Sequence, residues 1–347
     1  MLQRALAISG LLLVATSVAS PAAGQTSIVV NVAAESGQRL PYSVVTVLGG
    51  NGSSAFTDES GTYSFRSSAS PVRLRIRHLG FAPKDTTINL AGTRSATITV
   101  RLTPVALQLG VVDVRDNNTC KRSSNNETLA AIMQELITNA EHERMLRQQY
   151  PFWYRLRRTY DSYEPGFGLR RKRDDVWYAS LSNDRYRPGV AIRRAPRGRT
   201  RAYREVWIPS LLDLADTVFL RHHCFTYKGI TTVDGRAVHQ LDFEPGKSLT
   251  HSVDYRGSAY LDSATYVIRR ADFVLTNIDL LLTSATSLEI YTNYSQLFPG
   301  VALFDRIRSI QRGSGLAYNN FESAQIDDQK RIEVKFMRLP PGSSLNR

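Results

Sequence analysis

The six residues Val72-Arg73-Leu74-Arg75-Ile76-Arg77 alternate strictly between apolar and basic side chains. Because successive side chains of a β-strand point to opposite faces, this segment predicts a strand with one buried and one solvated face. Similar β-prone runs surround it, and turn residues such as Gly49-Gly50 and Ser60-Gly61 separate them. These runs cover residues 28–32, 43–47, 62–65 and 96–100. Short strands without an intervening helix predict a β-sandwich.

The segments between these strands carry a family pattern. It begins at Ser36-Gly37-Gln38-Arg39-Leu40-Pro41, continues through the turn at residues 57–63 and closes on Arg77-His78-Leu79-Gly80-Phe81. Over residues 26–103 this succession resembles the carboxypeptidase-regulatory-like domain. The resemblance implies a transthyretin-like sandwich that is not itself catalytic, and that accompanies metallopeptidases or outer-membrane uptake receptors. We expect Gly61 to adopt a positive φ and Phe81 to plug the sandwich.

The first 24 residues have the three parts of a secretion signal. Arg4 supplies a positive start, residues 5–18 are mostly apolar but too short to span a bilayer, and Ser20-Pro21-Ala22-Ala23-Gly24 offers small residues for cleavage. The alternative, an N-terminal core helix, conflicts with Pro21 and Gly24. We therefore expect export to the periplasm or to the outer membrane. No cysteine near the cut is available for a lipid anchor.

Beyond the sandwich, the pattern changes twice. A polar linker at residues 104–126 is followed by a helical period at residues 127–149, which ends before Pro151. Residues 150–338 return to alternating, aromatic-rich runs that predict an antiparallel β domain. The apolar positions of the helical period are Leu129, Ile132, Met133, Leu136, Ile137 and Ala140.

The hairpin pattern from Gly257 to Phe273 is similar to one found in lipoprotein-carrier-like half-barrels. In those proteins a curved antiparallel sheet wraps an apolar cavity. The resemblance implies the same for the C-terminal region. The predicted fold is therefore mainly β, with a sandwich, a linking helix and a C-terminal curved sheet or half-barrel.

The mature chain has two cysteines, Cys120 and Cys224. In an exported protein, two lone thiols are expected to form a disulfide, and the alternative is two buried free thiols. Their spacing is not the C-x-x-C of redox catalysts.

The chain is basic, with 44 Lys and Arg against 31 Asp and Glu. The excess concentrates between Arg144 and Arg204, where few acids intervene. An exported protein rarely meets nucleic acid, so a binding surface here would face an anionic membrane, a glycan or an envelope protein. The alternative is a solvated face in an arginine-rich chain. The candidate residues are Arg155, Arg157, Arg158, Arg170, Arg171, Lys172, Arg173, Arg193, Arg194, Arg197, Arg199 and Arg201.

The residues offer little for catalysis. The mature chain has none of the zincin, nucleophile-elbow or P-loop motifs, and we expect no cofactor. His222 and His223 would point to opposite faces of a strand, which argues against a metal site with Cys224. The acidic pairs Asp174-Asp175 and Asp327-Asp328 lie in polar stretches that predict solvated turns.

Aromatic residues alternate with the arginines of the basic block, among them Trp153, Tyr154, Trp177, Tyr178 and Trp207. Half-buried sheet positions explain such residues, and a groove for sugars or acyl chains is the alternative. We expect a non-enzymatic envelope protein that binds a ligand or a partner, with no indication of oligomeric state. The alternatives are a carbohydrate-binding protein and an accessory to an exported peptidase or uptake receptor.

Overall fold

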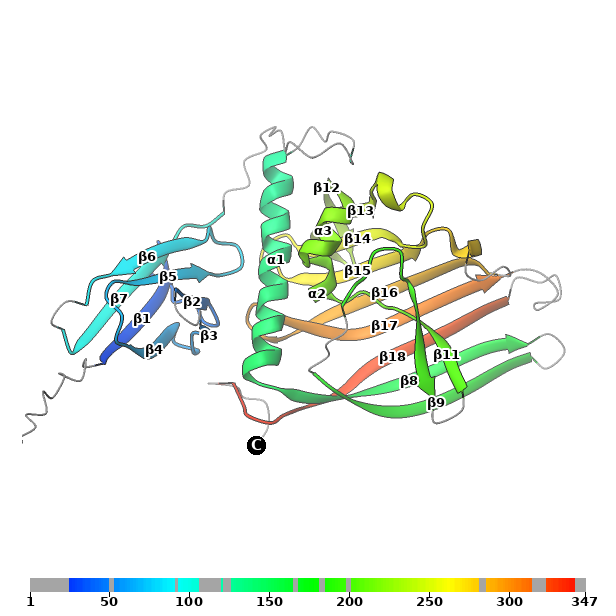
Figure 1. The fold of residues 1–347 in the computed structure, drawn as a ribbon, viewed down its shortest axis with the longest axis horizontal. Coiled ribbons are helices and arrows are strands. Elements are labelled where there is room, and N and C mark those ends of the chain that lie inside the picture. The colour runs from blue at the N-terminus through cyan, green and yellow to red at the C-terminus, as the bar shows by residue number, and fades with distance from the viewer. Residues whose placement is uncertain are drawn as a thin grey trace, which may run out of the picture.

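The computed structural model describes residues 25–49, 53–90, 93–105, 120, 126–164, 168–180, 185–197, 201–280, 285–313 and 323–340 (Figure 1). The expected signal segment at residues 1–24 and most of the linker at 104–126 lie outside the described residues.

The N-terminal part is a sandwich of two sheets. In the first sheet, β1 pairs antiparallel with β4 and parallel with β7, and the second sheet has the order β3-β2-β5-β6. The strands are β1 (Thr26–Ala34), β2 (Val44–Leu48), β3 (Ser54–Phe56), β4 (Thr62–Ser67), β5 (Val72–Arg77), β6 (Lys84–Ile88) and β7 (Ser95–Leu102).

The core of the sandwich follows the alternation of β5, where Val72, Leu74 and Ile76 are buried and the arginines between them are not. Gly61 has φ 72°, and a Cβ added there would lie 2.8 Å from the Val32 carbonyl oxygen. Only glycine fits such a turn without strain. The predictions of a sandwich and of a positive φ at Gly61 are confirmed.

Helix α1 (Asn126–Gln149) stands between the sandwich and the large sheet (Figure 1). Its apolar positions Ile132, Leu136 and Ala140 are fully buried, as the helical period predicts. It also buries polar side chains that join it to both sides. Glu135 accepts a hydrogen bond from the backbone N–H of Gly80 in the sandwich, and Asn139 bonds the backbone of Tyr266 and Ile268 in the sheet domain.

The C-terminal part is one open, antiparallel, nine-stranded sheet of order β12-β13-β14-β15-β16-β17-β18-β8-β9. The edge strands β12 and β9 do not pair with each other. The strands are β8 (Phe152–Glu164), β9 (Gly168–Ala179), β12 (His223–Val233), β13 (Arg236–Pro245), β14 (Tyr255–Asp262), β15 (Ile268–Leu275), β16 (Ala285–Phe298), β17 (Val301–Gly313) and β18 (Ser323–Phe336). The prediction of a mainly β fold is confirmed.

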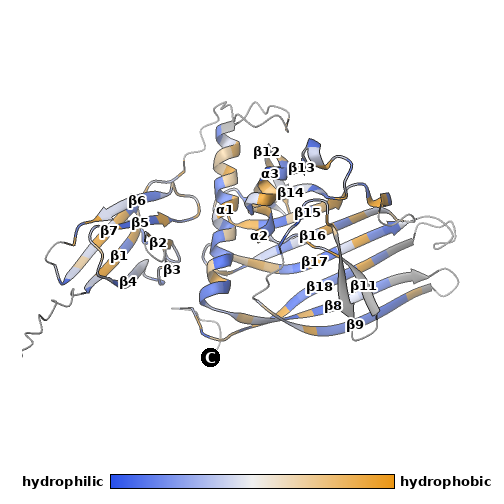
Figure 2. Ribbon diagram, viewed as in Figure 1, coloured by the Kyte–Doolittle hydropathy of each residue, from blue (hydrophilic) through white to orange (hydrophobic). Residues whose placement is uncertain are grey.

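The two faces of this sheet differ. The inner face is covered by α1, by the short helices α2 (Leu211–Leu214) and α3 (Thr217–His222), and by the hairpin of β10 (Ile192–Arg197) and β11 (Arg201–Val206) (Figure 1). Along β8, Phe152 and Leu156 are buried on the inner face, whereas Trp153 is exposed on the outer face. Figure 2 shows that hydrophilic residues dominate β8, β9 and β18.

Two expectations about this region are wrong. Asp174-Asp175 lie within β9 and Asp327-Asp328 lie within β18, not in solvated turns. Arginines on neighbouring strands pair with these carboxylates, and cross-strand pairs offset the low strand propensity of aspartate. Within this mainly β region, residues 211–222 form the two short helices α2 and α3, and Asp216 caps the second through the Val218 N–H.

Candidate functional site

A cavity of ≈ 780 Å³ lies on the inner face of the large sheet. Strands β8, β9, β16, β17 and β18 form its floor, the C-terminal half of α1 forms one wall, and residues 206–216 form the cover. The lining is mixed, and twelve of its 22 residues are apolar or aromatic: Tyr154, Leu156, Tyr178, Val206, Trp207, Ile208, Pro209, Leu211, Leu212, Tyr294, Phe304 and Ile307.

Aromatic rings organise the floor. The Tyr154 ring stacks on Tyr178 at 5.6 Å between centroids and meets the edge of Phe304 at 5.2 Å. Because these residues come from β8, β9 and β17, the register of three strands positions one cluster. Burial raises the pKa of Tyr154, so its hydroxyl stays neutral. The floor is therefore an uncharged surface with ordered rings.

The wall from α1 is polar. Arg147 donates to the Glu143 carboxylate one helical turn earlier, at 2.9 Å from Nε, and to the Ser180 carbonyl oxygen at 2.6 Å. The side chains of this pair are 13% and 2% exposed, so the ion pair is buried beside the apolar floor. Other polar residues line the cavity from α1, from the segment before β10, from the cover and from β18: Arg144, Gln148, Arg185, Asp216 and Gln329.

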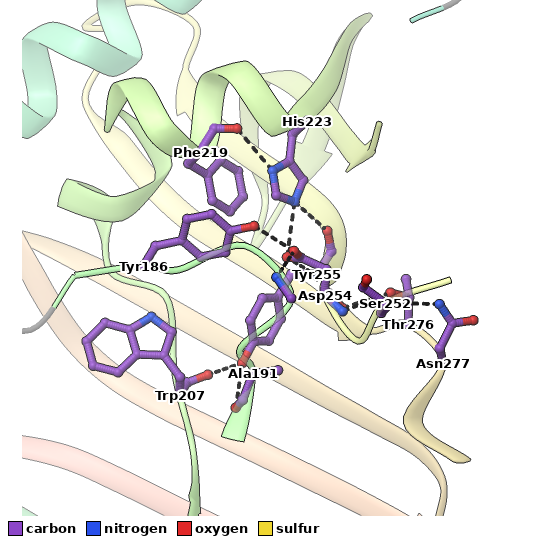
Figure 3. A network of polar contacts seen from close by, with 11 residues as sticks. Tyr186, Ala191, Trp207, Phe219, His223, Ser252, Asp254, Tyr255, Thr276 and Asn277 are labelled. Atoms are coloured by element: carbon purple, nitrogen blue, oxygen red, sulfur yellow. Dashed lines mark hydrogen bonds and ion pairs between the residues drawn. The ribbon is translucent and has the colours of Figure 1, made fainter. Parts of the chain in front are cut away.

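A buried polar network holds the cover in place (Figure 3). The backbone N–H of Trp207 donates to the Ala191 carbonyl oxygen at 2.8 Å, which closes the base of the β10–β11 hairpin. The hydroxyl of Tyr255, a fully buried residue of β14, donates to the Trp207 carbonyl oxygen and reaches that of Ala191 at 3.4 Å. The hairpin and the segment after it are thus tied to the sheet.

Asp254 is the centre of this network (Figure 3). Its carboxylate accepts hydrogen bonds from Tyr186 Oη at 2.6 Å and from the N–H groups of Gly189 and Tyr255 at 3.0 and 2.8 Å. It also lies 3.4 Å from His223 Nε2. Burial raises the pKa of Asp254, but the hydrogen bonds from His223, Tyr186 and Gly189 outweigh it, so the net shift is downward.

His223 is fully engaged by this environment. Its Nδ1 lies 3.0 Å from the Phe219 carbonyl oxygen and its Nε2 lies 3.0 Å from that of Tyr255. Both ring nitrogens therefore face backbone carbonyl oxygens, which only accept hydrogen bonds. The His223 ring also stacks on the Phe219 ring, with 3.8 Å between the ring centroids. His223 and Asp254 are held by contacts within the protein, which indicates a structural role for them in this network.

Sequence reasoning missed this pair. His223 and Asp254 are far apart in the chain, and the only local signal was the run His222-His223-Cys224, for which we considered a metal site and argued against it. The structure buries His223 and leaves His222 partly exposed at the end of α3. Within the described ranges, no three His, Cys, Asp or Glu side chains are placed to hold a metal ion.

Cys120 and Cys224 form a disulfide, with Cα atoms 5.5 Å apart and a sequence separation of 104. Cys224 follows His223 in the edge strand β12. The bond therefore ties the segment before α1 to the sheet, and the pairing expected from the two cysteines is present.

The candidate basic residues do not converge on one site. Arg157 pairs with Asp175, Arg158 with Asp327, Arg171 with Asp161, Lys172 with Asp174 and Arg155 with Glu333, at 2.5 to 3.1 Å. Four of these carboxylates come from a neighbouring strand and Asp174 lies in the same strand as Lys172, so the block that looked poor in acids is largely a cross-strand charge ladder. Arg170 and Arg173 lie in β9, Arg193, Arg194, Arg197 and Arg201 lie in the β10–β11 hairpin, and Arg199 lies outside the described residues.

The family comparison agrees with the sandwich. Residues 27–103 match the carboxypeptidase regulatory-like domain, and this part of the chain is such a domain. No curated protein matches the chain. Among the described helices, none has the length and apolar character to cross a bilayer.

The C-terminal part is similar in structure to solved proteins of low sequence identity. A DUF1329 family protein from Desulfovibrio piger shares 12% identity with a TM-score of 0.33, covering 60% of this chain and 95% of its own. A LolA superfamily protein from Nitrosomonas europaea shares 10%, with a TM-score of 0.31 and coverages of 61% and 94%. An outer membrane lipoprotein-sorting protein domain from Vibrio parahaemolyticus shares 9% sequence identity with a TM-score of 0.32, covering 62% of this chain and 97% of its own.

Proposed function

We propose that this protein is a non-enzymatic binding protein of the cell envelope, and that its inner-face cavity holds an apolar or amphipathic ligand. The observation that carries the proposal is the cavity itself, whose ≈ 780 Å³ lies in the range of small-molecule sites. Its floor of aromatic and aliphatic side chains suits a hydrocarbon chain, because burying apolar surface there releases water.

The arrangement of charge suggests how such a ligand would lie. The apolar floor belongs to strands, whereas Arg144, Arg185 and Asp216 line the cavity from α1, from the segment before β10 and from the cover. An amphipathic molecule would place its chain against Tyr154 and Phe304 and its polar group near these charged residues. The buried Glu143–Arg147 pair would border the chain without binding an anion, because its charges already neutralise each other.

The rest of the chain supports an envelope location. The N-terminal secretion pattern predicts export, and the Cys120–Cys224 disulfide suits an oxidising compartment. The regulatory-like sandwich, which packs on α1 through Glu135 and Gly80, would serve as a module for interaction with a partner.

A displacement assay tests the cavity. A fluorescent fatty-acid analogue bound to the wild-type protein should be displaced by palmitic acid or by a lysophospholipid. Ile307→Trp places a large ring in the cavity and should abolish binding, whereas Arg308→Trp adds the same ring to the outer face and should leave it intact. Equal binding by both variants, or none by the wild type, would contradict the proposal.

A further inference from the structure

Two tryptophans stand exposed on the outer face of the large sheet, at one end of β8 and β9. Trp153 is 45% exposed and Trp177 is 39% exposed. The register pairs Trp153 with Ala179 and Arg155 with Trp177, so the two indoles are diagonal neighbours on the same face. Large exposed aromatics side by side are uncommon on a surface that faces only water.

The chain that leaves β18 extends this apolar region. Met337 is 70% exposed and Leu339 is 43% exposed. The Met337 N–H donates to the Pro151 carbonyl oxygen at 2.9 Å, which holds this segment beside the start of β8. We call Trp153, Trp177, Met337 and Leu339 the outer patch.

Cations surround the outer patch. The Arg155 guanidinium lies 5.5 Å from the centroid of Trp177, and Lys335 Nζ lies 5.0 Å from it. Glu333 pairs with both cations, at 2.9 and 3.2 Å, and so fixes them beside the indole. Arg338, between Met337 and Leu339, is exposed as well.

Further positive charge lies along the same face. By strand alternation Arg173, Arg308 and Lys330 project outward with the Arg157 side chain, and all three are exposed. Among the described residues, none of these three makes a salt bridge. Many arginines of the outer face form ion pairs in the charge ladder. These three described cations form none, so the outer face keeps a positive charge.

We infer that the outer patch docks the protein on the surface of a lipid bilayer that carries anionic head groups. Tryptophan is enriched at the level of the head groups because its ring is apolar and its N–H is polar. Exposed Met and Leu side chains would enter the acyl boundary, and the surrounding Arg and Lys would attract lipid phosphates. Apolar anchors and cations together give the two signals that peripheral binding needs.

The same contacts argue against a sugar as the occupant. Carbohydrate stacking requires a free aromatic face, and two cations already lie over the Trp177 ring. A position at the membrane would also suit the cavity, since Tyr178, the neighbour of Trp177, lines it from the opposite face. The inference rests on the outer face alone and holds whatever the cavity binds.

Tryptophan fluorescence with vesicles tests it directly, because the chain has three tryptophans and Trp207 is in the cavity cover. In a Trp207→Phe protein, vesicles of phosphatidylglycerol and phosphatidylcholine should shift the emission to the blue, and brominated lipid should quench it. In a Trp153→Ser/Trp177→Ser protein, flotation with the same vesicles should weaken roughly tenfold or more. Both changes are at exposed positions, so the fold should be unaffected. An unaltered melting temperature of the double variant is the control for this.

Three results would overturn the inference. The first is flotation of the double variant equal to that of the wild type, and the second is equal binding to vesicles of phosphatidylcholine alone. The third is absence of vesicle binding together with cross-linking of the outer patch to an envelope protein, which would assign the surface to a protein partner. A Lys335→Gln protein should bind more weakly than the wild type at low salt, and no loss would exclude the electrostatic contribution.

Discussion

The inner and outer faces of the large sheet are built from the same strands, but the inner face lines a cavity and the outer face carries ion pairs. Leu156 lines the cavity while Arg157, the next residue, pairs with Asp175 on the outer face. Ile307 and Arg308 repeat the contrast on β17. The comparison teaches that a residue's role in this domain is decided by which face it occupies, more than by its neighbours in sequence.

Side chains on the two faces should also contribute differently to the free energy of unfolding. Inner-face side chains lose water on folding, and each buried aliphatic group contributes about 1.5 to 3 kcal/mol. Outer-face ion pairs keep much of their hydration, and salt screens them. Substitutions on the inner face should therefore change stability, and matched substitutions on the outer face should change it little.

The largest effect is expected at Asp254, which anchors the cover of the inner face. Asp254→Asn places an NH2 donor where the Tyr186 hydroxyl and the Gly189 N–H already donate to a buried carboxylate, which should cost about 3 to 5 kcal/mol of unfolding free energy. Denaturant unfolding followed by circular dichroism measures this loss. Asp272→Asn is the matched control, because Asp272 pairs with Arg270 on the outer face and the side chains are 20% and 27% exposed. Equal losses of unfolding free energy in both variants would contradict the expected difference between the two faces.

Adjacent residues of β8 give the next test. Leu156→Ala should cost about 2 to 5 kcal/mol, because it removes buried methyl groups and enlarges the cavity. Arg157→Ala should leave the melting temperature nearly unchanged, because the Arg157 side chain is 41% exposed. Thermal unfolding of the two variants side by side is the measurement, and a large loss at Arg157 with none at Leu156 would reverse the assignment of faces.

A pH test examines α1, which covers the inner face and meets the sandwich on its other side. Burial raises the pKa of Glu135 to about 7, although the Gly80 N–H lowers it slightly. The folded state thus holds a proton that the unfolded state loses near its ordinary value, so stability should fall as pH rises from about 4.5 to 7.

The expected loss from Glu135 is at most about 3 kcal/mol, on the scale of 1.36 kcal/mol per pH unit of pKa difference. Glu135→Gln keeps the acceptor for Gly80 and removes the charge, so it should flatten the pH dependence and stabilise the protein at pH 8. His78 contributes with the opposite sign, because burial lowers its pKa to about 3 and stability falls as pH drops below about 6.5. Unfolding curves from pH 4 to 8 that show no difference between wild type and Glu135→Gln would contradict the assignment.

The smallest effect is expected in the charge ladder. Arg171→Gln removes a pair with Asp161 in which the arginine side chain is 63% exposed. The melting temperature should stay within error of the wild type at physiological salt, because the ion pair is solvated. Differential scanning calorimetry at two salt concentrations checks this, and a marked loss that salt does not relieve would show that the ladder is structural.

Local patterns were sufficient to predict much of the fold. The alternation at residues 72–77, the helical period of α1 and the turn at Gly61 are properties of short segments, and the structure follows them. The pairing of the two cysteines followed from compartment chemistry. Most of these features could be predicted because they depend on neighbours in sequence. The disulfide could be predicted because cysteines of exported proteins usually pair.

The site depended on contacts that no short segment contains. The carboxylates that neutralise the basic block, such as Asp327 for Arg158, come from strands distant in sequence, so the block looked more available than it is. The cavity cover relies on Asp254 meeting Tyr186 and His223 from three segments. The half-barrel resemblance implied a cavity, but an (i, i+4) pair such as Glu143 and Arg147 gives no sign in sequence that it is buried in a cavity wall.

Native mass spectrometry of the protein purified from a bacterial envelope tests the central claim most directly. We predict that the wild-type chain retains one apolar or amphipathic molecule in its inner-face cavity, that Arg308→Trp retains it, and that Ile307→Trp loses it. Equal occupancy in the Ile307→Trp protein, or a wild-type chain that never carries or accepts such a molecule, would contradict the claim.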